Sequence, residues 1–494
     1  MSLPLSTLLR SAGLASMLVL LGGCAVGPDF VRPTAPAADR YTAAPLPGAT
    51  LAADGHAQLL TANETDLAEW WRLFESPPLD VMVRQALANS PTLQAAEASL
   101  RQSQYNLRAG YGVFYPHVTA DLGASRERSA PSQQGLATRS TVFNLVTLSG
   151  TVSYALDVFG GERRAVEGLR AQTDYQRDAT LAAYLTLSAN VVNTCIARAA
   201  YAAQIRTTEQ LIGLEQEQLR LTEVQVRAGT SPYANLLGIR SMLSANQAAL
   251  APLRQKVGQA EDLLATLQGV VPSRATLPDV ELTALALPVE LPVSLPSDLV
   301  RQRPDILAAE AQWHVASANI GVATAAMFPS FNLAGIAGAA APNFGRLSAA
   351  DSLFWSIGPA ASIPLFQGGT LWFDRKAAVE ADREAEANYR QTVLGAFAQV
   401  ADSLQALMHD AEALQAQTAA WHTAGEALGL LQVNYRAGLV AYPDVLVADV
   451  LFHEATIAHL QAVAQRHQDT VALFVALGGG WWTQPSPANI GGAR

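Results

Sequence analysis

The sequence repeats one long pattern twice, and this duplication limits the possible folds more than any other feature. Pro91 and the tripeptide Ala96-Glu97-Ala98 recur 213 residues later as Pro304 and Ala309-Glu310-Ala311. Further matching blocks follow in the same order: Phe114-Tyr115-Pro116 and Met327-Phe328-Pro329, Phe159-Gly160-Gly161 and Phe366-Gln367-Gly368-Gly369, Val226-Arg227-Ala228-Gly229 and Tyr435-Arg436-Ala437-Gly438. A unit of about 210 residues is too long for the short stacked repeats of a solenoid. The duplication therefore predicts two pseudo-symmetric halves, which further copies of the chain could complete.

The N-terminus predicts secretion and lipidation. In residues 1–23 the only charged side chain is Arg10, and the apolar run that follows is about half the roughly 20 residues of a membrane-spanning helix. Leu21-Gly22-Gly23-Cys24 resembles a bacterial lipobox, in which Cys24 is acylated and the chain is cut just before it. Such a lipid anchors a protein to a membrane surface, and Ala25 in place of Asp implies the outer membrane. The alternative is that Cys24 is an ordinary small residue of the signal peptide.

The composition fits an envelope protein. A net charge of −10 and a pI of about 5.3 argue against nucleic acid as a partner. Cys195 is the only other cysteine, so that no internal disulfide can form once Cys24 is acylated. After the signal, we expect no window of the sequence to be a transmembrane helix. A chain that crosses a membrane without such a helix must cross it as strands.

Changes in composition divide the chain into segments. We expect helices at about Glu64–Asn89 and Pro91–Leu107, and an irregular connector with little regular structure in the proline-rich stretch between the halves. The predicted segments are a signal peptide (1–23), an extended lipidated tether (24–62), the first repeat (63–269), the connector (270–303), the second repeat (304–477) and a C-terminal tail (478–494).

Each repeat contains a predicted β-hairpin. In the first (about 117–158), His117–Arg128 and Thr141–Val158 alternate roughly, with Val142, Leu145, Leu148 and Val152 among polar neighbours. The second (about 331–366) pairs Phe331–Ala341 with Phe354–Phe366. These strands are long enough to cross a bilayer, yet four strands cannot close a barrel and open edges are not tolerated in lipid. Either the hairpins are soluble, with their aromatic residues in a core, or several chains pool their strands.

A long helical hairpin follows each β-hairpin. Gly161–Gly229 and Asp374–Gly438 contain no proline and would each extend roughly 100 Å as a helix. In the second, apolar or small residues recur at alternating gaps of four and three from Val393 to Leu428, which is typical of coiled-coil packing. Each ends at Arg-Ala-Gly, where glycine is the expected C-terminal cap. Return helices are expected at Ser231–Gln268 and about Tyr442–Leu477, which gives helical hairpins at about 161–269 and 374–477.

No catalytic constellation is predicted. His453-Glu454 begins like a zinc-protease helix, but Ile457 stands where the second histidine must be. Neither long helix offers a convincing pair of carboxylates or a Ser/His/Asp set. The remaining helix histidines are expected to be solvated: His409, His422, His459 and His467. We therefore expect no enzyme activity, no metal site and no cofactor.

Several blocks resemble the TolC-type outer-membrane efflux proteins, the outer membrane factor family, and specifically its lipoprotein branch. The resemblance covers essentially the whole mature chain, in order. The blocks are Cys24-Ala25-Val26-Gly27-Pro28-Asp29-Phe30, Trp70-Trp71, Leu156-Asp157-Val158-Phe159-Gly160-Gly161, Arg301-Gln302-Arg303-Pro304-Asp305-Ile306, Pro364-Leu365-Phe366-Gln367-Gly368-Gly369, Tyr435-Arg436-Ala437-Gly438-Leu439 and Ala476-Leu477-Gly478-Gly479-Gly480-Trp481.

This resemblance implies a mixed fold of α-helices and membrane β-strands. In a homotrimer, each chain would give four strands to one twelve-stranded barrel and its long coiled-coil helices to a periplasmic tube. The implied function is a passive exit duct in the outer membrane for drugs or other toxic small molecules. Its implied partners are outer-membrane lipid, a periplasmic adaptor protein and an inner-membrane transporter driven by protons. Two alternatives remain: a duct for type I protein secretion, and a coiled-coil envelope lipoprotein that forms no channel.

The resemblance also places a gate at the periplasmic tips of the helical hairpins. Asn235 and Asp444 lie six residues past Gly229 and Gly438, and in the family the second of these positions commonly carries an acidic side chain that points into the closed tip. Three Asp444 carboxylates would attract cations, whereas the alternative is that Asp444 only caps its helix. The family often has a second acidic residue where this chain has Val447. The other candidate residues are Tyr442 and Pro443 for an apolar constriction, Tyr435 and Arg436 for ties between hairpins, and Arg227, Gly229 and Gly438 for the hairpin turns and adaptor docking.

Overall fold

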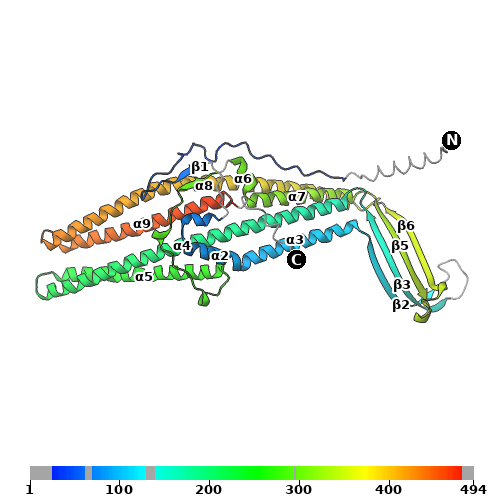
Figure 1. The fold of residues 1–494 in the computed structure, drawn as a ribbon, viewed down its shortest axis with the longest axis horizontal. Coiled ribbons are helices and arrows are strands. Elements are labelled where there is room, and N and C mark those ends of the chain that lie inside the picture. Colours follow the sequence, from blue (N-terminus) through cyan, green and yellow to red (C-terminus); the bar gives the residue numbers. More distant parts are fainter. Residues whose placement is uncertain (1–24, 62–68, 130–139, 294–295, 481–494) are drawn as a thin grey trace. The chain divides into compact units, whose positions relative to one another are not determined.

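A computed structural model describes residues 25–61, 69–129, 140–293 and 296–480. The chain forms two compact units, one of residues 1–33, 100–176 and 309–389, and the other of residues 34–99, 177–308 and 390–494. The predicted signal peptide, Cys24 and residues 481–494 of the predicted tail lie outside the described residues. Figure 1 labels the elements along the chain.

The order of the elements confirms the internal duplication. Helices α4 and α8 contain 67 residues each, and the return helices α5 and α9 contain 35 each. The first half runs α3 (Pro91–Gly110), β2 (His117–Ser129), β3 (Thr141–Leu156), α4 (Gly161–Arg227) and α5 (Tyr233–Leu267), and the second runs α7 (Pro304–Ala325), β5 (Ser330–Ala341), β6 (Leu353–Ser362), α8 (Thr370–Arg436) and α9 (Tyr442–Ala476).

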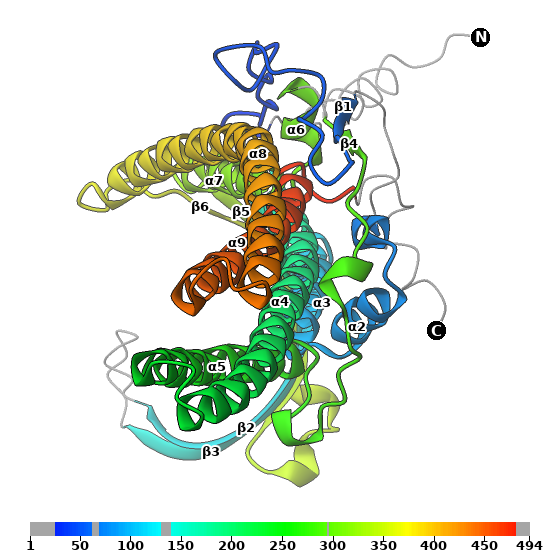
Figure 2. The ribbon, with the colours of Figure 1, turned by 90° about the vertical axis from the view of Figure 1, so that its left-hand side faces the viewer.

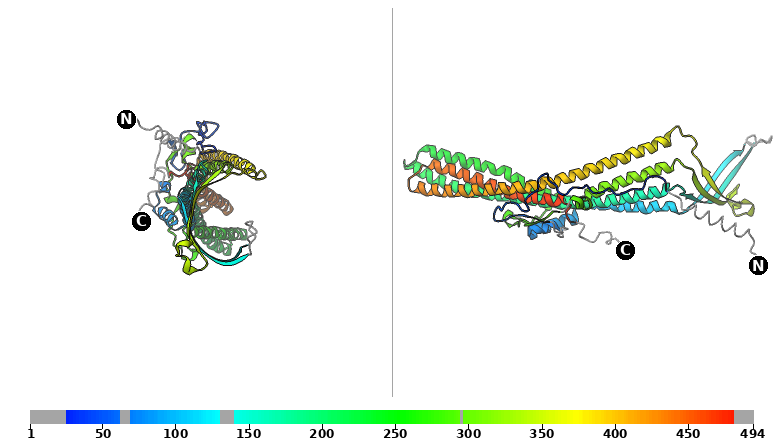
Figure 3. Two further views of the ribbon diagram at one scale, coloured as in Figure 1. Left: turned by 90° about the vertical axis from the view of Figure 1, so that its right-hand side faces the viewer. Right: turned by 90° about the horizontal axis from the view of Figure 1, so that it is seen from above.

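The first unit contains one curved antiparallel sheet of four strands in the order β2-β3-β5-β6 (Figure 3). Its register puts large apolar side chains on one face, because Val118 pairs with Val152 and Leu122 pairs with Leu148. The same face continues across the second hairpin, where Ala337 pairs with Trp355. Polar side chains such as Thr119, Asp121, Thr147 and Ser149 alternate with them and therefore lie on the opposite face.

Two strand ends differ from the sequence prediction. Strand β3 stops at Leu156, because the Asp157 carboxylate accepts hydrogen bonds from the N–H groups of Glu162 and Arg163 and so caps helix α4. Strand β6 stops at Ser362 and not at Phe366, since Pro364 has no N–H to donate to a ladder.

One expected strand face and one expected helix start also differ. Leu145 faces away from Leu148, because the two positions differ by three and alternate positions of an unbroken strand share a face. The expected second long helix starts four residues early, at Thr370 and not at Asp374.

The second unit has its core where α2 (Pro77–Asn89) packs with α4 and α9. Trp70 is 1% exposed and stacks on Phe474 with ring centroids 5.7 Å apart, and Met82 Sδ lies 3.7 Å from Cys195 Sγ. The helix expected over 64–89 is wrong in its described part, where a 3-10 helix η1 (Trp70–Phe74) precedes α2. Glu75 and Ser76 separate the two, and Pro77 begins α2, because proline suits the first turn of a helix and not its interior.

The seam predicted for the second long helix is confirmed by burial. Most of its predicted positions are buried in the second unit: Val393, Val400, Leu404, Leu407, Ala411, Leu414 and Leu428. Phe397, Thr418, Trp421 and Gly425 are half-buried. Figure 2 shows the two helical hairpins, α4 with α5 and α8 with α9. Long helices buried along one stripe in this way are stabilised by their neighbours and not by propensity alone.

The connector is more ordered than the sequence predicted. Strand β4 (Glu290–Pro292) pairs in parallel with β1 (Leu59–Thr61), and a short helix α6 (Pro296–Gln302) follows. The tether is extended, as expected, but its residues 50–58 are tied to helix α9. Arg466 is 1% exposed and donates hydrogen bonds to the side chains of Gln58 and Thr50. Residues 34–61 of the tether and the connector therefore form part of the folded second unit.

Of the histidines expected to be solvated, His467 is buried and His459 is half-buried. His467 is 5% exposed and lies between the carbonyls of Val463 and Leu285, and His459 stacks on Trp421 with centroids 4.9 Å apart. Burial lowers the pKa of both imidazoles, so that they stay neutral at physiological pH. Their burial depends on partners from other segments of the chain, which the local helix sequence does not show.

The expectation that no window could be a transmembrane helix is also too strict. One 18-residue window of α4 has a mean hydropathy of 1.3 and passes by length and composition. Its helix carries Val191, Val192 and Ile196, which are fully buried within the second unit. We therefore assign these apolar residues to packing between helices and not to lipid.

Candidate functional site

The candidate site is the pair of turns that close the two helical hairpins. Helices α4 and α8 both end two residues before a glycine with positive φ, +73° at Gly229 and +74° at Gly438. The residue after each glycine donates its N–H to a carbonyl five residues earlier, at 2.9 Å in both turns. This closure satisfies carbonyls at the helix end and requires a residue that tolerates the left-handed region. The expected glycine caps are thus present.

Asp444 lies in the first turn of α9, where it is exposed. Its Oδ2 accepts a hydrogen bond from the Ala441 N–H at 3.1 Å, and its own N–H donates to the Ala441 carbonyl at 3.1 Å. Within the chain, Asp444 is therefore a helix cap. Asn235, the matching residue of the first repeat, instead donates from Nδ2 to Ser231 Oγ at 3.3 Å. The two turns share one backbone design and differ in charge.

The tyrosines of the second turn connect the hairpins. Tyr435 Oη donates to Gln225 Oε1 at 3.5 Å, which joins the last turn of α8 to the last turn of α4. Its ring lies 5.2 Å from that of Tyr442, measured between centroids. Tyr442 is only 7% exposed and packs with Ile239 and Val445. It therefore belongs to the core between the hairpins, whereas Pro443 beside it is exposed.

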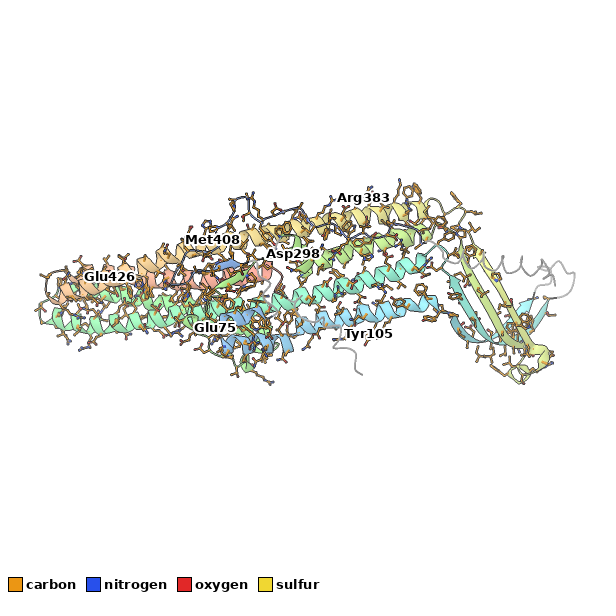
Figure 4. All side chains as sticks on the ribbon, turned by 45° about the horizontal axis from the view of Figure 1, so that its top comes forward. Glu75, Tyr105, Asp298, Arg383, Met408 and Glu426 are labelled. Atoms are coloured by element: carbon orange, nitrogen blue, oxygen red, sulfur yellow. The ribbon has the colours of Figure 1, made fainter. Side chains whose placement is uncertain are left out.

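The remaining candidate residues lie on the surface of the turns. Arg227 Nε donates to the Glu223 carbonyl at 3.3 Å, within its own helix. Arg436 is exposed at the end of α8. Figure 4 labels Glu426, further back along the same helix, as a reference point.

Sequence reasoning did not bring together two carboxyl groups behind the turns, one buried on α4 and one half-buried on α9. Glu215 on α4 is 4% exposed, and its Oε1 accepts a hydrogen bond from Asn246 Nδ2 at 2.7 Å. Burial and the charge of Asp449 on α9 together raise the pKa of Glu215 to about 7, although the hydrogen bond from Asn246 opposes this shift. Burial also raises the pKa of Asp449 to about 6. No local pattern could reveal this pair, because it depends on the alignment of α4 with α9.

A second pair of carboxyl groups joins α8 to α9. Burial and the neighbouring Asp469 raise the pKa of Asp410 to about 8, although the charge of Arg466 opposes this shift. The carboxyl group of Asp410 is therefore largely protonated at neutral pH. Each of the two pairs joins a long helix to α9, so the sequence of either long helix alone does not show it.

Comparison with known proteins identifies the kind of channel that these elements build. A family model described as outer membrane efflux protein matches residues 82–270 and 295–479. The chain belongs to the outer membrane efflux protein family. It is 29% identical to the toluene efflux pump outer membrane protein TtgC of Pseudomonas putida over 481 residues, which cover 96% of both chains. It is 31% identical to the pyoverdine export outer membrane protein OpmQ of Pseudomonas aeruginosa over 484 residues, 96% of this chain and 97% of OpmQ.

A solved structure of the outer-membrane channel OprN matches with a TM-score of 0.84 at 26% identity, covering 93% of this chain and all of OprN. The efflux protein described here is accordingly an outer-membrane channel, and three chains close one twelve-stranded barrel above a periplasmic helical tube. It works with a periplasmic adaptor and an inner-membrane pump in a tripartite system.

Proposed function

We propose that the channel is a passive exit duct for drugs or other toxic small molecules, and that it carries out no chemistry of its own. The names of two relatives support this substrate class, since TtgC is a toluene efflux protein and OpmQ exports pyoverdine. Their cargoes differ although their similarity to this chain is nearly equal. The duct therefore selects little, and a proton-driven inner-membrane pump chooses the substrate. Cleavage after residue 23 and acylation of Cys24 belong to the same proposal.

The observation that carries the proposal is the four-stranded sheet of the first unit. Apolar side chains such as Leu122, Leu148 and Trp355 are 48% to 77% exposed on one face, and β2 and β6 are edge strands within the chain. Exposed apolar faces and long free edges promote aggregation in water. A barrel of three chains in lipid covers both, because each edge pairs with a neighbouring chain and the apolar face meets acyl tails.

Reconstitution tests the duct directly. The purified protein should run as a heat-modifiable trimer that resists sodium dodecyl sulphate, and it should conduct ions in planar bilayers. A soluble monomer without conductance would contradict the proposal. Deleting the gene separates the substrate classes, because an efflux duct predicts sensitivity to toxic compounds whereas a secretion duct predicts retention of an exported protein.

The gate is proposed at the turn after α8. Three exposed Asp444 carboxylates around one axis would form a ring that attracts cations, and the exposed Pro443 would narrow the opening beside it. Each carboxylate also caps its helix within the chain, so that capping and cation binding are compatible. Arg227, Gly229 and Gly438 shape the turns that an adaptor would contact.

Loss of the Tyr435 hydroxyl should loosen the closed tip. Tyr435→Phe removes the hydrogen bond to Gln225 but keeps the ring against Tyr442, so we expect a higher closed-state conductance and an intact trimer. Single-trimer recordings measure this change. Tyr233→Phe is the control, because Tyr233 is 57% exposed on α5. Equal conductance of the Tyr435→Phe variant and the wild type would remove Tyr435 from the gate.

A further inference from the structure

Two sequence blocks that the duct does not explain lie against each other in the first unit. One is Ala25–Phe30, which directly follows the lipidation site, and the other is Phe159–Arg164, where strand β3 gives way to helix α4. The Val26 N–H donates to the Phe159 carbonyl at 3.0 Å. The blocks are more than 130 residues apart in sequence, so this contact is a tertiary one that the local sequence does not require.

Arg164 holds the backbone of the N-terminal block. Its side chain is 5% exposed; Nε donates to the Val26 carbonyl at 3.3 Å, and Nη2 donates to the Gly27 carbonyl at 3.4 Å and to Asp29 Oδ1 at 2.6 Å. Nη1 donates to Glu167 Oε2 at 2.8 Å, which orients the guanidinium from its own helix. Buried arginine paired in this way is a specific contact and not a solvated surface charge.

Three glycines let the backbones approach closely. A Cβ on Gly27, where φ is +95°, would lie 2.5 Å from Gly321 Cα, and a Cβ on Gly160 would lie 2.6 Å from Ala25. A Cβ on Gly321 would lie 2.6 Å from Arg164 Cγ and 3.0 Å from the Val26 carbonyl oxygen. Contacts this short exclude any side chain.

The block is also fixed to helix α7 of the second repeat. The Phe30 ring stacks on His314 with centroids 4.3 Å apart and meets Trp313 edge to face at 5.4 Å. Arg32 Nε lies 2.9 Å from Glu310 Oε1. His314 Nε2 in turn lies 2.9 Å from Glu167 Oε1 on α4, so the N-terminal block bridges helices of both repeats.

We propose that the junction between β3 and α4 is a docking site for the chain's own lipid-bearing N-terminus, with Arg164 as its positioning residue. Ala25 is seated beside Gly160 and directly follows Cys24 in the sequence, so the proposal rests on the proposed acylation of Cys24. Strand β3 ends at Leu156, close to this point in the sequence. The site therefore sets the acyl chains at the level where the strands leave the membrane. A lipid on a loose tether would have no such fixed position.

A nitroxide on Val31 tests the site, because Val31 is 78% exposed and lies between the two fixed side chains of Phe30 and Arg32. Val31→Cys is made in the Cys24→Ser background, so that no lipid is attached. Cys195 does not compete for the label, since it is 1% exposed and burial raises its pKa to about 12. We expect an immobilised spectrum in this unlipidated trimer. A mobile spectrum would show that the lipid alone holds the segment, and would overturn the proposal.

Two variants break the site from opposite sides. Arg164→Ala removes the positioning residue, and Asp29→Arg places a second cation against Arg164 without changing α4; both should convert the label to a mobile spectrum. Arg170→Ala is the matched control. Arg170 lies on α4 like Arg164, but its side chain donates to the Tyr111 hydroxyl and not to the N-terminal block. Should Arg164→Ala fail to form trimers, Asp29→Arg decides the result. An unchanged spectrum in an Asp29→Arg trimer would overturn the proposal.

A glycine pair gives an independent test by size alone. Gly321→Ala should release the label, because its Cβ would overlap Arg164, whereas Gly168→Ala should not, since its nearest neighbour lies at 3.8 Å. Equal spectra for these two variants would show that close backbone approach is not required, and would contradict the site as described.

Discussion

Single residues at the turns of this efflux channel serve both the fold and the proposed gate. Asp444 satisfies a backbone N–H at the start of α9, and a capping side chain of this kind stabilises a helix by about 0.5–2 kcal/mol. The same carboxylate remains exposed on the side away from that bond. Its effect on stability and its effect on ions can therefore be separated by a change that removes charge and keeps an oxygen.

Asp444→Asn should lower cation selectivity and weaken block by multivalent cations. Asparagine still caps a helix, so trimer yield should stay at the wild-type level while the three charges of the ring are lost. Single-trimer reversal potentials and block by a trivalent cation measure the effect. Asp351→Asn is the control, because Asp351 lies in the connection before β6 and not at the turns. Unchanged selectivity and unchanged block together would assign Asp444 to capping alone.

Glu215→Gln should stabilise the helical turns at alkaline pH. The folded-state pKa of Glu215 is raised to about 7 from an ordinary value near 4.5, so folding binds a proton between these pH values and stability falls as pH rises through them. Above pH 7 the free energy of unfolding is lower by the full amount, at most about 3 kcal/mol. Glutamine does not titrate, so the Glu215→Gln variant should be much more stable than the wild type at pH 8 and equally stable at pH 4.

Amide hydrogen exchange of the α5 and α9 peptides measures this difference, with variant and wild type compared at each pH. Glu223→Gln is the control, since Glu223 is 39% exposed on the same helix and pairs with Arg240. Equal protection of the Glu215→Gln and wild-type proteins at pH 8 would mean that ionisation of Glu215 does not destabilise the folded state.

The sequence predicts some of these residues and not others, for a physical reason. Asp444 could be found from its position after a glycine cap and from resemblance, because both are local patterns. Glu215 and Asp449 could not, because they are 234 residues apart in sequence and meet only through the alignment of two helices. Arg164 was missed similarly, since its partners come from the N-terminus.

At the scale of elements, periodicity determines what can be predicted. The long helices follow from proline-free heptads with glycine caps, and their bounds agree with the structure within a few residues. The single helix expected over 64–89 failed at Pro77, and the connector concealed β4, since a three-residue strand has no period of its own. Short elements of this kind depend on a partner strand elsewhere in the chain.

An arginine pair on β3 tests the membrane face of the sheet. Leu148→Arg should reduce trimer yield, because a charge at the bilayer midplane costs about 2–4 kcal/mol. Thr147→Arg should be mild, since Thr147 lies on the opposite face between Gly123 and Ala340. Trimer yield in outer-membrane fractions measures both. Equal yields from the two variants would argue against membrane strands here.

At the scale of the whole molecule, one chain alone does not form a complete channel. Its sheet has free edges at β2 and β6, and both problems seen in the sequence, open edges and helices too long to bury themselves, are solved by three copies. The sequence could predict this need from strand number and helix length, but only the resemblance supplied the number of copies.

Replacing the lipidated cysteine separates anchoring from assembly. Cys24→Ser should abolish acylation and still yield a trimer, because the barrel and not the lipid crosses the membrane. Radiolabelled palmitate measures acylation, and resistance to sodium dodecyl sulphate measures the trimer. Cys195→Ser is the control, since its thiol is buried in the second unit and should carry no palmitate. Palmitate in the Cys24→Ser protein would refute the lipidation site. A monomeric, acyl-free product would instead contradict the expectation that three chains can close the barrel without the lipid.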